Sequence, residues 1–257
     1  MKKEKNLILK ITNEQEMKIS EKITFMCLLS FIFPFLLLSF TNASGIKSLD
    51  DYVFPPDSEP YGQTYGEWEA KFWELHVNLE PEKSPASPSY QPTECLLLQD
   101  DNMTFLSDFY SEIEYRNYEC KISQIPFAIP ALTEGCSYGD FENPNDKMIE
   151  DCLKSHNPYA IVTVTIDGKE IPDIDRFRIT SDWFILNVTN KENVYDIKSG
   201  SHKAKIDAIM PIIKPLPPGV HEIRTEVFQD VPSIIMSDVP LHRVITYKLI
   251  VEPDLNN

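Results

Sequence analysis

The sequence predicts a mainly β fold of the α+β class, an antiparallel β-sandwich with one amphipathic aromatic helix and a short disulfide-linked helix. From Tyr159 onward, several short segments alternate apolar and polar residues and are separated by turn residues, a pattern typical of antiparallel strands. Two segments, 64–79 and 143–154, have a helical pattern. Four cysteines follow the N-terminal leader, and an even number in an exported chain favours disulfides.

The first 44 residues have the composition of a secretory leader. Six lysines precede the uncharged segment Ile23–Ile46, whose centre is almost wholly apolar, and small residues follow at Ala43 and Ser44. This order predicts a signal peptide cleaved near these two residues. The alternative is an uncleaved N-terminal anchor, because the apolar segment is long enough to span a bilayer. In either case we expect residues 45–257 to form a single exported β-rich domain, secreted or at the cell surface.

The net charge limits the kinds of partner. The chain carries 40 acidic and 24 basic side chains, a formal charge of −16, and the leader itself is basic. This charge opposes binding to nucleic acid and to anionic membrane surfaces. We therefore expect membrane contact only through an uncleaved N-terminal segment, and an envelope glycan or another protein as partner. The sequence does not identify a cofactor.

The segment Thr64–Leu79 is the strongest helix prediction. Thr64 followed by Glu67 forms a capping box, and Tyr65, Trp68, Phe72, Leu75 and Leu79 lie on one stripe of the helix. Glu67 and Lys71 have the i,i+4 spacing that favours an ion pair. Trp73 and Val77 widen the apolar surface, so we expect other elements to cover this helix on more than one side. The preceding segment Lys47–Gln63 is predicted to be irregular and to run extended over the surface.

Short strands and the four cysteines occupy the next part of the chain. Strands are predicted at Cys95–Gln99, Met103–Leu106 and Cys120–Ile125, and an edge strand or extended passage at Phe127–Leu132, which contains Pro130. Among three open pairings we favour Cys95–Cys120 and Cys136–Cys152, which close local loops. A four-thiolate metal site is disfavoured because no C-x-x-C spacing occurs.

The short helix 143–154 is predicted to begin with Asn143 as N-cap and Pro144 at its first position. The disulfide Cys136–Cys152 would then attach it to the preceding loop.

The C-terminal half is predicted to be strands. Ala160–Ile166 is the first, followed by a turn at Asp167-Gly168. Further strands are predicted at Phe177–Ile179, Phe184–Val188, His221–Val227 and Val244–Val251. Between them, Lys205–Ile213 is a broken apolar run.

One set of motifs resembles a known family. In order, these are YGEWEAKFWEL, Cys95, MTFL, Cys120, IPFAIPAL, CSYGD, Cys152, VTIDG, RFRITSDWF and PGVHEI. The order resembles a family of uncharacterised exported proteins of archaea and bacteria, typified by Y-x-E-W-x-A-x-W-W followed by cysteine-containing strands. Phe72 stands where that family often has Trp. The resemblance covers Tyr61–Val251 and implies a secreted β-sandwich, but it supplies no activity and no catalytic residues.

Two residues of the aromatic helix are candidate metal ligands. Glu69 and His76 are seven residues apart and fall on the apolar side of the helix. A carboxylate and an imidazole on one buried face suit a metal site or an acid–base pair. The other interpretation is a polar pair satisfied by backbone groups. The other histidines outside the leader show no H-x-H or H-x₃-H spacing, the patterns typical of metal ligands.

Three further residues are candidates for recognition or modification. Trp183, beside Asp182, is a candidate for stacking on a sugar. Asn102 and Asn187 lie in N-x-S/T sequons and are candidate glycosylation sites. The nucleophile-elbow and nucleotide-binding glycine motifs are absent from the sequence. We therefore predict an exported non-enzymatic binding or structural domain. The alternative is a metal-binding protein or metal-dependent enzyme that uses Glu69, His76 and other histidines.

Overall fold

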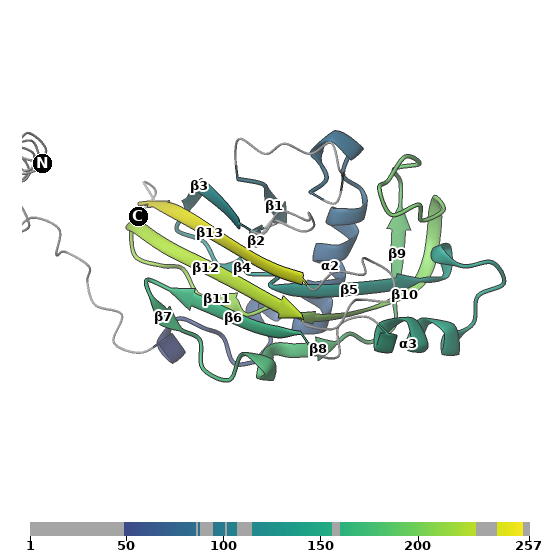
Figure 1. The fold of residues 1–257 in the computed structure, drawn as a ribbon, viewed down its shortest axis with the longest axis horizontal. Helices are drawn as coiled ribbons and strands as arrows, with labels where there is room; N and C mark the ends of the chain where they lie inside the picture. Colours follow the sequence, from purple (N-terminus) through teal and green to yellow (C-terminus); the bar gives the residue numbers. More distant parts are fainter. Residues whose placement is uncertain are drawn as a thin grey trace, which may run out of the picture. The chain divides into compact units, whose positions relative to one another are not determined.

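The computed structural model describes residues 49–85, 87, 95–100, 102–106, 115–155, 160–229 and 241–253. These residues belong to one compact unit, Lys47–Asn257, which is mainly β, as predicted. Figure 1 shows its strands with two α-helices, α2 (Tyr65–Val77) and α3 (Asp146–Ser155). In this described part of the chain, no helix has the length and apolar character needed to cross a membrane.

The strands form three sheets. The first has the order β1 (Leu97–Asp100), β2 (Met103–Leu106), β4 (Phe127–Ala128), β11 (Ile212–Ile213). The second contains β5 (Leu132–Ser137), β10 (Gly200–Ile209) and β8 (Arg178–Thr180), with β9 (Phe184–Val188) also paired to β10. The third has the order β3 (Tyr115–Ser123), β13 (Leu241–Glu252), β12 (Gly219–Gln229), β6 (Ile161–Ile166), β7 (Lys169–Glu170).

Most of the strand pairs are antiparallel, but two are parallel. The last strand, β13, lies between β12 and β3 and pairs with β3 in parallel, from Val244↔Tyr115 to Glu252↔Ser123. β2 and β4 also pair in parallel. The hairpin of β6 and β7 turns at Asp167 and Gly168, which both have positive φ, as the Asp-Gly dipeptide predicts.

The predicted capping box begins α2. Thr64 Oγ1 accepts a hydrogen bond from the Glu67 backbone N–H at 3.2 Å, and the Glu67 carboxylate accepts one from the Thr64 N–H at 2.7 Å. The predicted ion pair of Glu67 with Lys71 is wrong. Lys71 instead forms an ion pair with Asp100 of β1 at 2.8 Å, because the Glu67 carboxylate is hydrogen-bonded to the N-cap residue Thr64.

The first and second sheets cover α2 on different sides, so its burial on more than one side is confirmed. Phe105 of β2 lies against Trp68 and Phe72, whereas Trp73 and Val77 join the apolar cluster of β9 and β10. The residues of α2 that are buried are Tyr65, Trp68, Glu69, Phe72, Trp73, His76 and Val77. Leu75 and Leu79, predicted on the buried stripe, are only half-buried because the covered surface is centred nearer Trp73.

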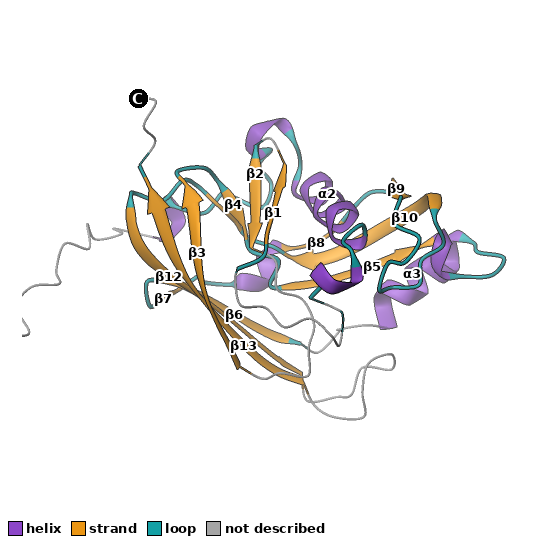
Figure 2. Cartoon of the chain, turned by 90° about the horizontal axis from the view of Figure 1, so that it is seen from above, coloured by secondary structure: helices purple, strands orange, loops and turns teal. Residues whose placement is uncertain are grey.

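α2 and α3 lie on opposite faces of the second sheet (Figure 2). Gly135 of β5 lies beneath the Trp73 ring of α2, while its neighbour Cys136 is bonded to Cys152 of α3. Successive side chains of a strand point to opposite faces, so the two helices must cover different sides.

Two local predictions in this region are wrong. The segment Leu132–Ser137 is a strand at the edge of the second sheet rather than a loop. Glu134 and Gly135 have low strand propensity, but β10 pairs with the segment along its whole length. Helix α3 begins at Asp146, not after Asn143. Asn143 adopts a left-handed φ of 54°, which asparagine tolerates better than most residues, and the following proline disfavours a helical backbone at this position. Asn145 Oδ1 instead accepts from the Met148 N–H at 3.1 Å.

Candidate functional site

Glu69 and His76 lie where the helical periodicity predicts, inside the core. Their exposed fractions are 0% and 1%. The imidazole of His76 packs among the rings of Phe72, Trp73 and Tyr195, with centroid separations of 5.3, 6.1 and 5.7 Å. These contacts place the imidazole against three aromatic rings.

Burial determines the ionisation of both residues. Loss of hydration raises the pKa of Glu69 well above its ordinary value, and the nearby charge of Asp207 adds to the rise. Burial lowers the pKa of His76 to about 3, so the ring is neutral at pH 7. Neither carboxylate oxygen of Glu69 has a hydrogen-bond partner among the described residues. The same residues contain no group of three or more His, Cys, Asp or Glu side chains placed to hold a metal ion.

The other described histidines make separate structural contacts. His221 lies between two acceptors, the Asp167 carboxylate at 2.8 Å from Nδ1 and the Pro217 carbonyl oxygen at 2.9 Å from Nε2. The hydrogen bond with Asp167 raises the pKa of His221. Both partners are acceptors, so the protonated ring can donate to each of them. His242 pairs with Glu226 at 2.8 Å on the third sheet.

Trp183 is half-buried, and cationic side chains occupy its surroundings. It directly precedes β9, and Lys203 and Lys205 extend from the neighbouring β10. Their Nζ atoms lie 4.0 and 5.2 Å from the Trp183 ring centroid, and the Lys203 Nζ also pairs with Asp146 of α3 at 2.6 Å. A cation–π contact at an exposed site contributes about 0.5–1 kcal/mol to stability. A sugar stacking on the face of the ring beneath Lys203 would have to displace its ammonium group.

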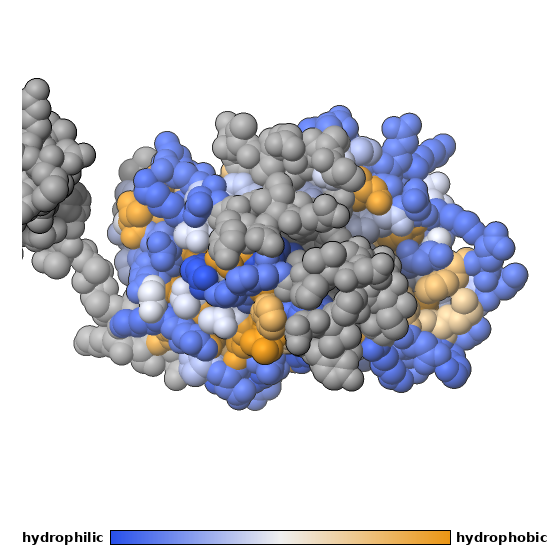
Figure 3. All heavy atoms as spheres, viewed as in Figure 1, coloured by the Kyte–Doolittle hydropathy of each residue, from blue (hydrophilic) through white to orange (hydrophobic). Residues whose placement is uncertain are grey.

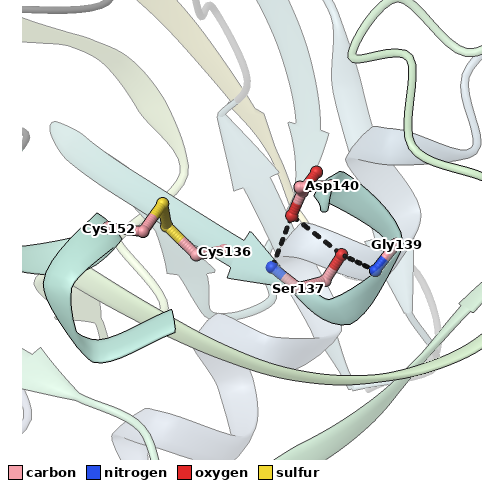
Figure 4. The surroundings of a disulfide bond; sticks show 5 residues. All are labelled: Cys136, Ser137, Gly139, Asp140 and Cys152. Carbon is pink, nitrogen blue, oxygen red and sulfur yellow. Dashed lines mark hydrogen bonds between the residues drawn. A yellow bond between two sulfur atoms is a disulfide. The ribbon is translucent and has the colours of Figure 1, made fainter. Parts of the chain in front are cut away.

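All four cysteines outside the leader are in disulfides. Cys95 is bonded to Cys120 of β3, and Cys136 of β5 to Cys152 of α3, which is the pairing favoured from the sequence. Figure 4 shows the second disulfide beside the turn that follows β5. In that turn Ser137 Oγ accepts from the Gly139 N–H at 3.2 Å. The disulfide joins α3 to a strand and not, as predicted, to a loop.

The sequons of Asn102 and Asn187 differ in their surroundings. Asn102 is exposed at the turn between β1 and β2, but its partner Thr104 is fully buried. Asn187 is exposed in β9, where its amide nitrogen lies 3.3 Å from the Glu74 carboxylate and its amide oxygen accepts from Ser201. Both asparagines are thus at the surface, and their glycosylation remains a prediction.

One aromatic surface was not predicted from the sequence. Tyr61 is 47% exposed and has φ 57° and ψ 29°, in the left-handed region. That conformation costs a side chain other than glycine about 1–2 kcal/mol. Its ring meets Phe54 edge-to-face, with centroids 5.9 Å apart, and the Lys214 Nζ lies 5.4 Å from the Phe54 ring centroid. A Tyr-Gly dipeptide directly after Pro60 was the available signal, but it indicates only a turn.

The loop that carries Tyr61 is fixed to the core on both sides. The Tyr65 hydroxyl donates to the Phe54 carbonyl at 2.7 Å, and Trp68 Nε1 donates to the Pro60 carbonyl at 2.9 Å. Both donors come from α2. The Phe54 N–H also donates to the Ile212 carbonyl at 2.9 Å. The loop backbone is therefore held in place by hydrogen bonds from α2 and to the segment that contains Ile212.

Comparisons with known proteins identify no family. No family model and no curated protein match the chain. Two solved structures match. One is titled "Structure of PbICP-C in complex with falcipain-2", with 10% identity and a TM-score of 0.26, and the match covers 59% of this chain and 99% of the other. The second is the cysteine protease inhibitor EhICP2 from Entamoeba histolytica, with 12% identity, a TM-score of 0.18 and coverage of 55% and 99%. Scores this low carry no functional argument.

Proposed function

We propose that this chain is exported and acts outside the cytoplasm, in the cell envelope or extracellular space, as a non-enzymatic binding domain. The observation that carries the proposal is that every cysteine outside the leader is disulfide-bonded. Disulfides form and persist in oxidising compartments and are rare in the cytosol. The basic and apolar leader is the second support, because it has the order of a secretory signal.

A binding role is supported by the surface. Figure 3 shows a largely hydrophilic face with separate apolar patches. Among the described residues, Tyr61 and Phe228 are aromatic side chains that are more than a third exposed, at 47% and 39%. The acidic charge favours partners that are neutral or basic. An envelope glycan or a protein surface satisfies this condition.

Export can be tested on the full chain with a C-terminal tag. We expect the protein outside the cytoplasm, with a new N-terminus near Ala43 or Ser44, and with its four remaining cysteines resistant to alkylation until a reductant is added. The variant Leu37→Arg, which interrupts the apolar segment, should stay in the cytoplasm with reactive thiols. A wild-type chain that remains cytoplasmic with free thiols would contradict the proposal.

The binding role can be tested on the exported, processed protein. Any compound that binds the native state stabilises it by mass action and so raises the melting temperature. At a ligand concentration of a hundredfold over Kd, the free energy of unfolding increases by about 2.7 kcal/mol. We expect such a shift with an envelope glycan or a protein partner. Turnover of a substrate that is abolished by a point mutation would instead show an enzyme.

A further inference from the structure

We propose that Tyr61 and Phe54 form a recognition site for a neutral polysaccharide, with the Tyr61 ring stacking on the apolar face of a sugar. The proposal rests on the proposed function, because it supposes a binding domain that meets envelope or extracellular glycans. It names a site different from Trp183 and a chemical class of ligand.

The backbone at Tyr61 indicates that its ring is not present for stability. A residue with φ 57° and ψ 29° is in a region that glycine adopts without strain. Tyrosine here both strains the backbone and leaves 47% of its surface exposed. Strained residues tend to occur at functional sites, where the surrounding structure holds them in place. Here that structure is the pair of hydrogen bonds from Tyr65 and Trp68 to the loop backbone.

The geometry of the ring pair suits stacking. Tyr61 and Phe54 meet at an interplanar angle of 76°, so the edge of one ring contacts the face of the other. The Lys214 Nζ is near the Phe54 ring, and its own hydrogen bond goes to the Asp51 carbonyl at 3.1 Å. No described cation lies over the Tyr61 ring. Tyrosine also offers a hydroxyl beside its flat apolar surface, which suits a ligand that is apolar on one face and polar at its edges.

The charges around the site select a neutral sugar. The same loop exposes Asp57 and Glu59, whose carboxylates can accept hydrogen bonds from sugar hydroxyls. These carboxylates and the net charge of −16 oppose a polysaccharide that carries carboxylate, sulfate or phosphate groups. Three prolines at 55, 56 and 60 restrict the loop backbone, so little conformational entropy is lost when a ligand binds.

Trp183 provides a matched control. It is also an aromatic side chain at the surface, but Lys203 lies 4.0 Å from its ring centroid. If stacking depends on an unobstructed ring, removing the Tyr61 ring should weaken binding while removing the Trp183 ring should not.

The experiment is affinity electrophoresis of the exported, processed protein in gels that contain soluble polysaccharides. The neutral probes are hydroxyethyl cellulose, laminarin, glycogen and galactomannan, and the anionic probe is alginate. Each is run at 0.15 M and 1 M NaCl with the wild type, Tyr61→Gly, Tyr61→Ala and Trp183→Ala. Melting temperatures are measured for every variant.

We expect at least one neutral polysaccharide to retard the wild type at both salt concentrations, and alginate to have no effect. Tyr61→Gly should weaken binding at least tenfold without lowering the melting temperature, because glycine removes the ring and relieves the backbone. Tyr61→Ala should bind as weakly, and Trp183→Ala should bind like the wild type.

The site is refuted if no neutral polysaccharide retards the wild type, if Tyr61→Gly binds normally, or if Trp183→Ala loses the binding instead. These results do not affect export, which is read separately from the location and thiol state of the chain. A cytoplasmic chain that still binds through Tyr61 would refute the proposed function but not the site.

Discussion

Glu69 shows most clearly how one residue opposes the stability of this fold. Its carboxyl lies in the core, and neither oxygen has a partner in the described part of the chain. The raised pKa means that the folded chain holds this proton more tightly than the unfolded chain. Stability from this group is therefore complete below the ordinary pKa of 4.5 and falls as the pH rises toward the folded value. Glu134, whose pKa burial raises to about 8, acts in the same direction.

We expect Glu69→Met to increase the free energy of unfolding at pH 8 by about 1–3 kcal/mol, because an apolar side chain removes an unsatisfied buried group. The gain should shrink toward pH 4, where the wild-type carboxyl is protonated in both states. Glu69→Gln, which removes the charge but keeps a buried polar group, is the control. Denaturant titrations at several pH values measure the free energy of unfolding of each protein. A Glu69→Met variant that is less stable than the wild type at pH 8 would contradict the prediction and show that the carboxyl group makes a stabilising contact.

His76 makes the opposite prediction on the acid side. Its pKa is about 3 in the folded chain and 6.5 ordinarily, so the unfolded chain binds the proton more tightly. Stability from this group is complete above pH 6.5 and is lost as the pH falls toward 3. In His76→Phe, which keeps a ring among its aromatic neighbours, the loss between these pH values should be smaller. An unchanged pH profile in the variant would mean that His76 is hydrated.

At the scale of elements, the approach of α2 to β5 depends on a glycine. A Cβ on Gly135 would lie 2.4 Å from the Trp73 Cε2 atom, far inside contact distance. We expect Gly135→Ala to destabilise the fold by about 1–3 kcal/mol, the range for overpacked cores. In a Trp73→Ala background the same change should have little effect. Chemical denaturation of the four proteins in this cycle measures the coupling, and additive effects would argue against the contact.

The end of α2 is attached to β9 through one side chain. Asn78 Nδ2 donates to the Glu74 and Asn187 carbonyls, each at 2.8 Å. Its Oδ1 accepts from the Thr189 N–H at 2.7 Å, and also from the Thr189 hydroxyl and the Asn190 N–H. Because the site is partly exposed, we expect Asn78→Ala to destabilise by about 1–2 kcal/mol. Asn78→Asp keeps the acceptor oxygen, so its melting temperature should fall less than that of Asn78→Ala. Equal decreases in melting temperature would show that the Oδ1 hydrogen bonds contribute little.

At the scale of the whole molecule, the disulfides join elements that are separated in the chain. Cys95–Cys120 spans 25 residues and Cys136–Cys152 spans 16. Each is expected to contribute about 3 kcal/mol in the chain-entropy treatment. The double variant Cys136→Ala/Cys152→Ala should therefore melt at a lower temperature than the wild type, and a reductant should lower the wild type further. If reductant does not change the melting temperature of the wild type, the disulfides contribute little to its stability.

Local signals predicted much of this fold because they arise from contacts within a few residues. The capping box at Thr64, the Asp-Gly turn, the strand at Ile161–Ile166 and the burial of Glu69 and His76 all follow from sequence spacing. The disulfide pairing also follows from proximity along the chain. The candidate sites were less predictable, because whether Trp183 offers a free ring depends on Lys203 and Lys205 of another strand.

The remaining features were decided by contacts between residues far apart in the chain. β5 is a strand because β10 pairs with it, although its own residues favour a loop. Lys71 pairs with Asp100 because the first sheet comes beside α2. Tyr61 keeps its left-handed backbone and exposed ring because hydrogen bonds from α2 hold the loop that carries it. Sequence periodicity reports which face of an element is apolar, whereas the tertiary structure alone determines which neighbours that face meets.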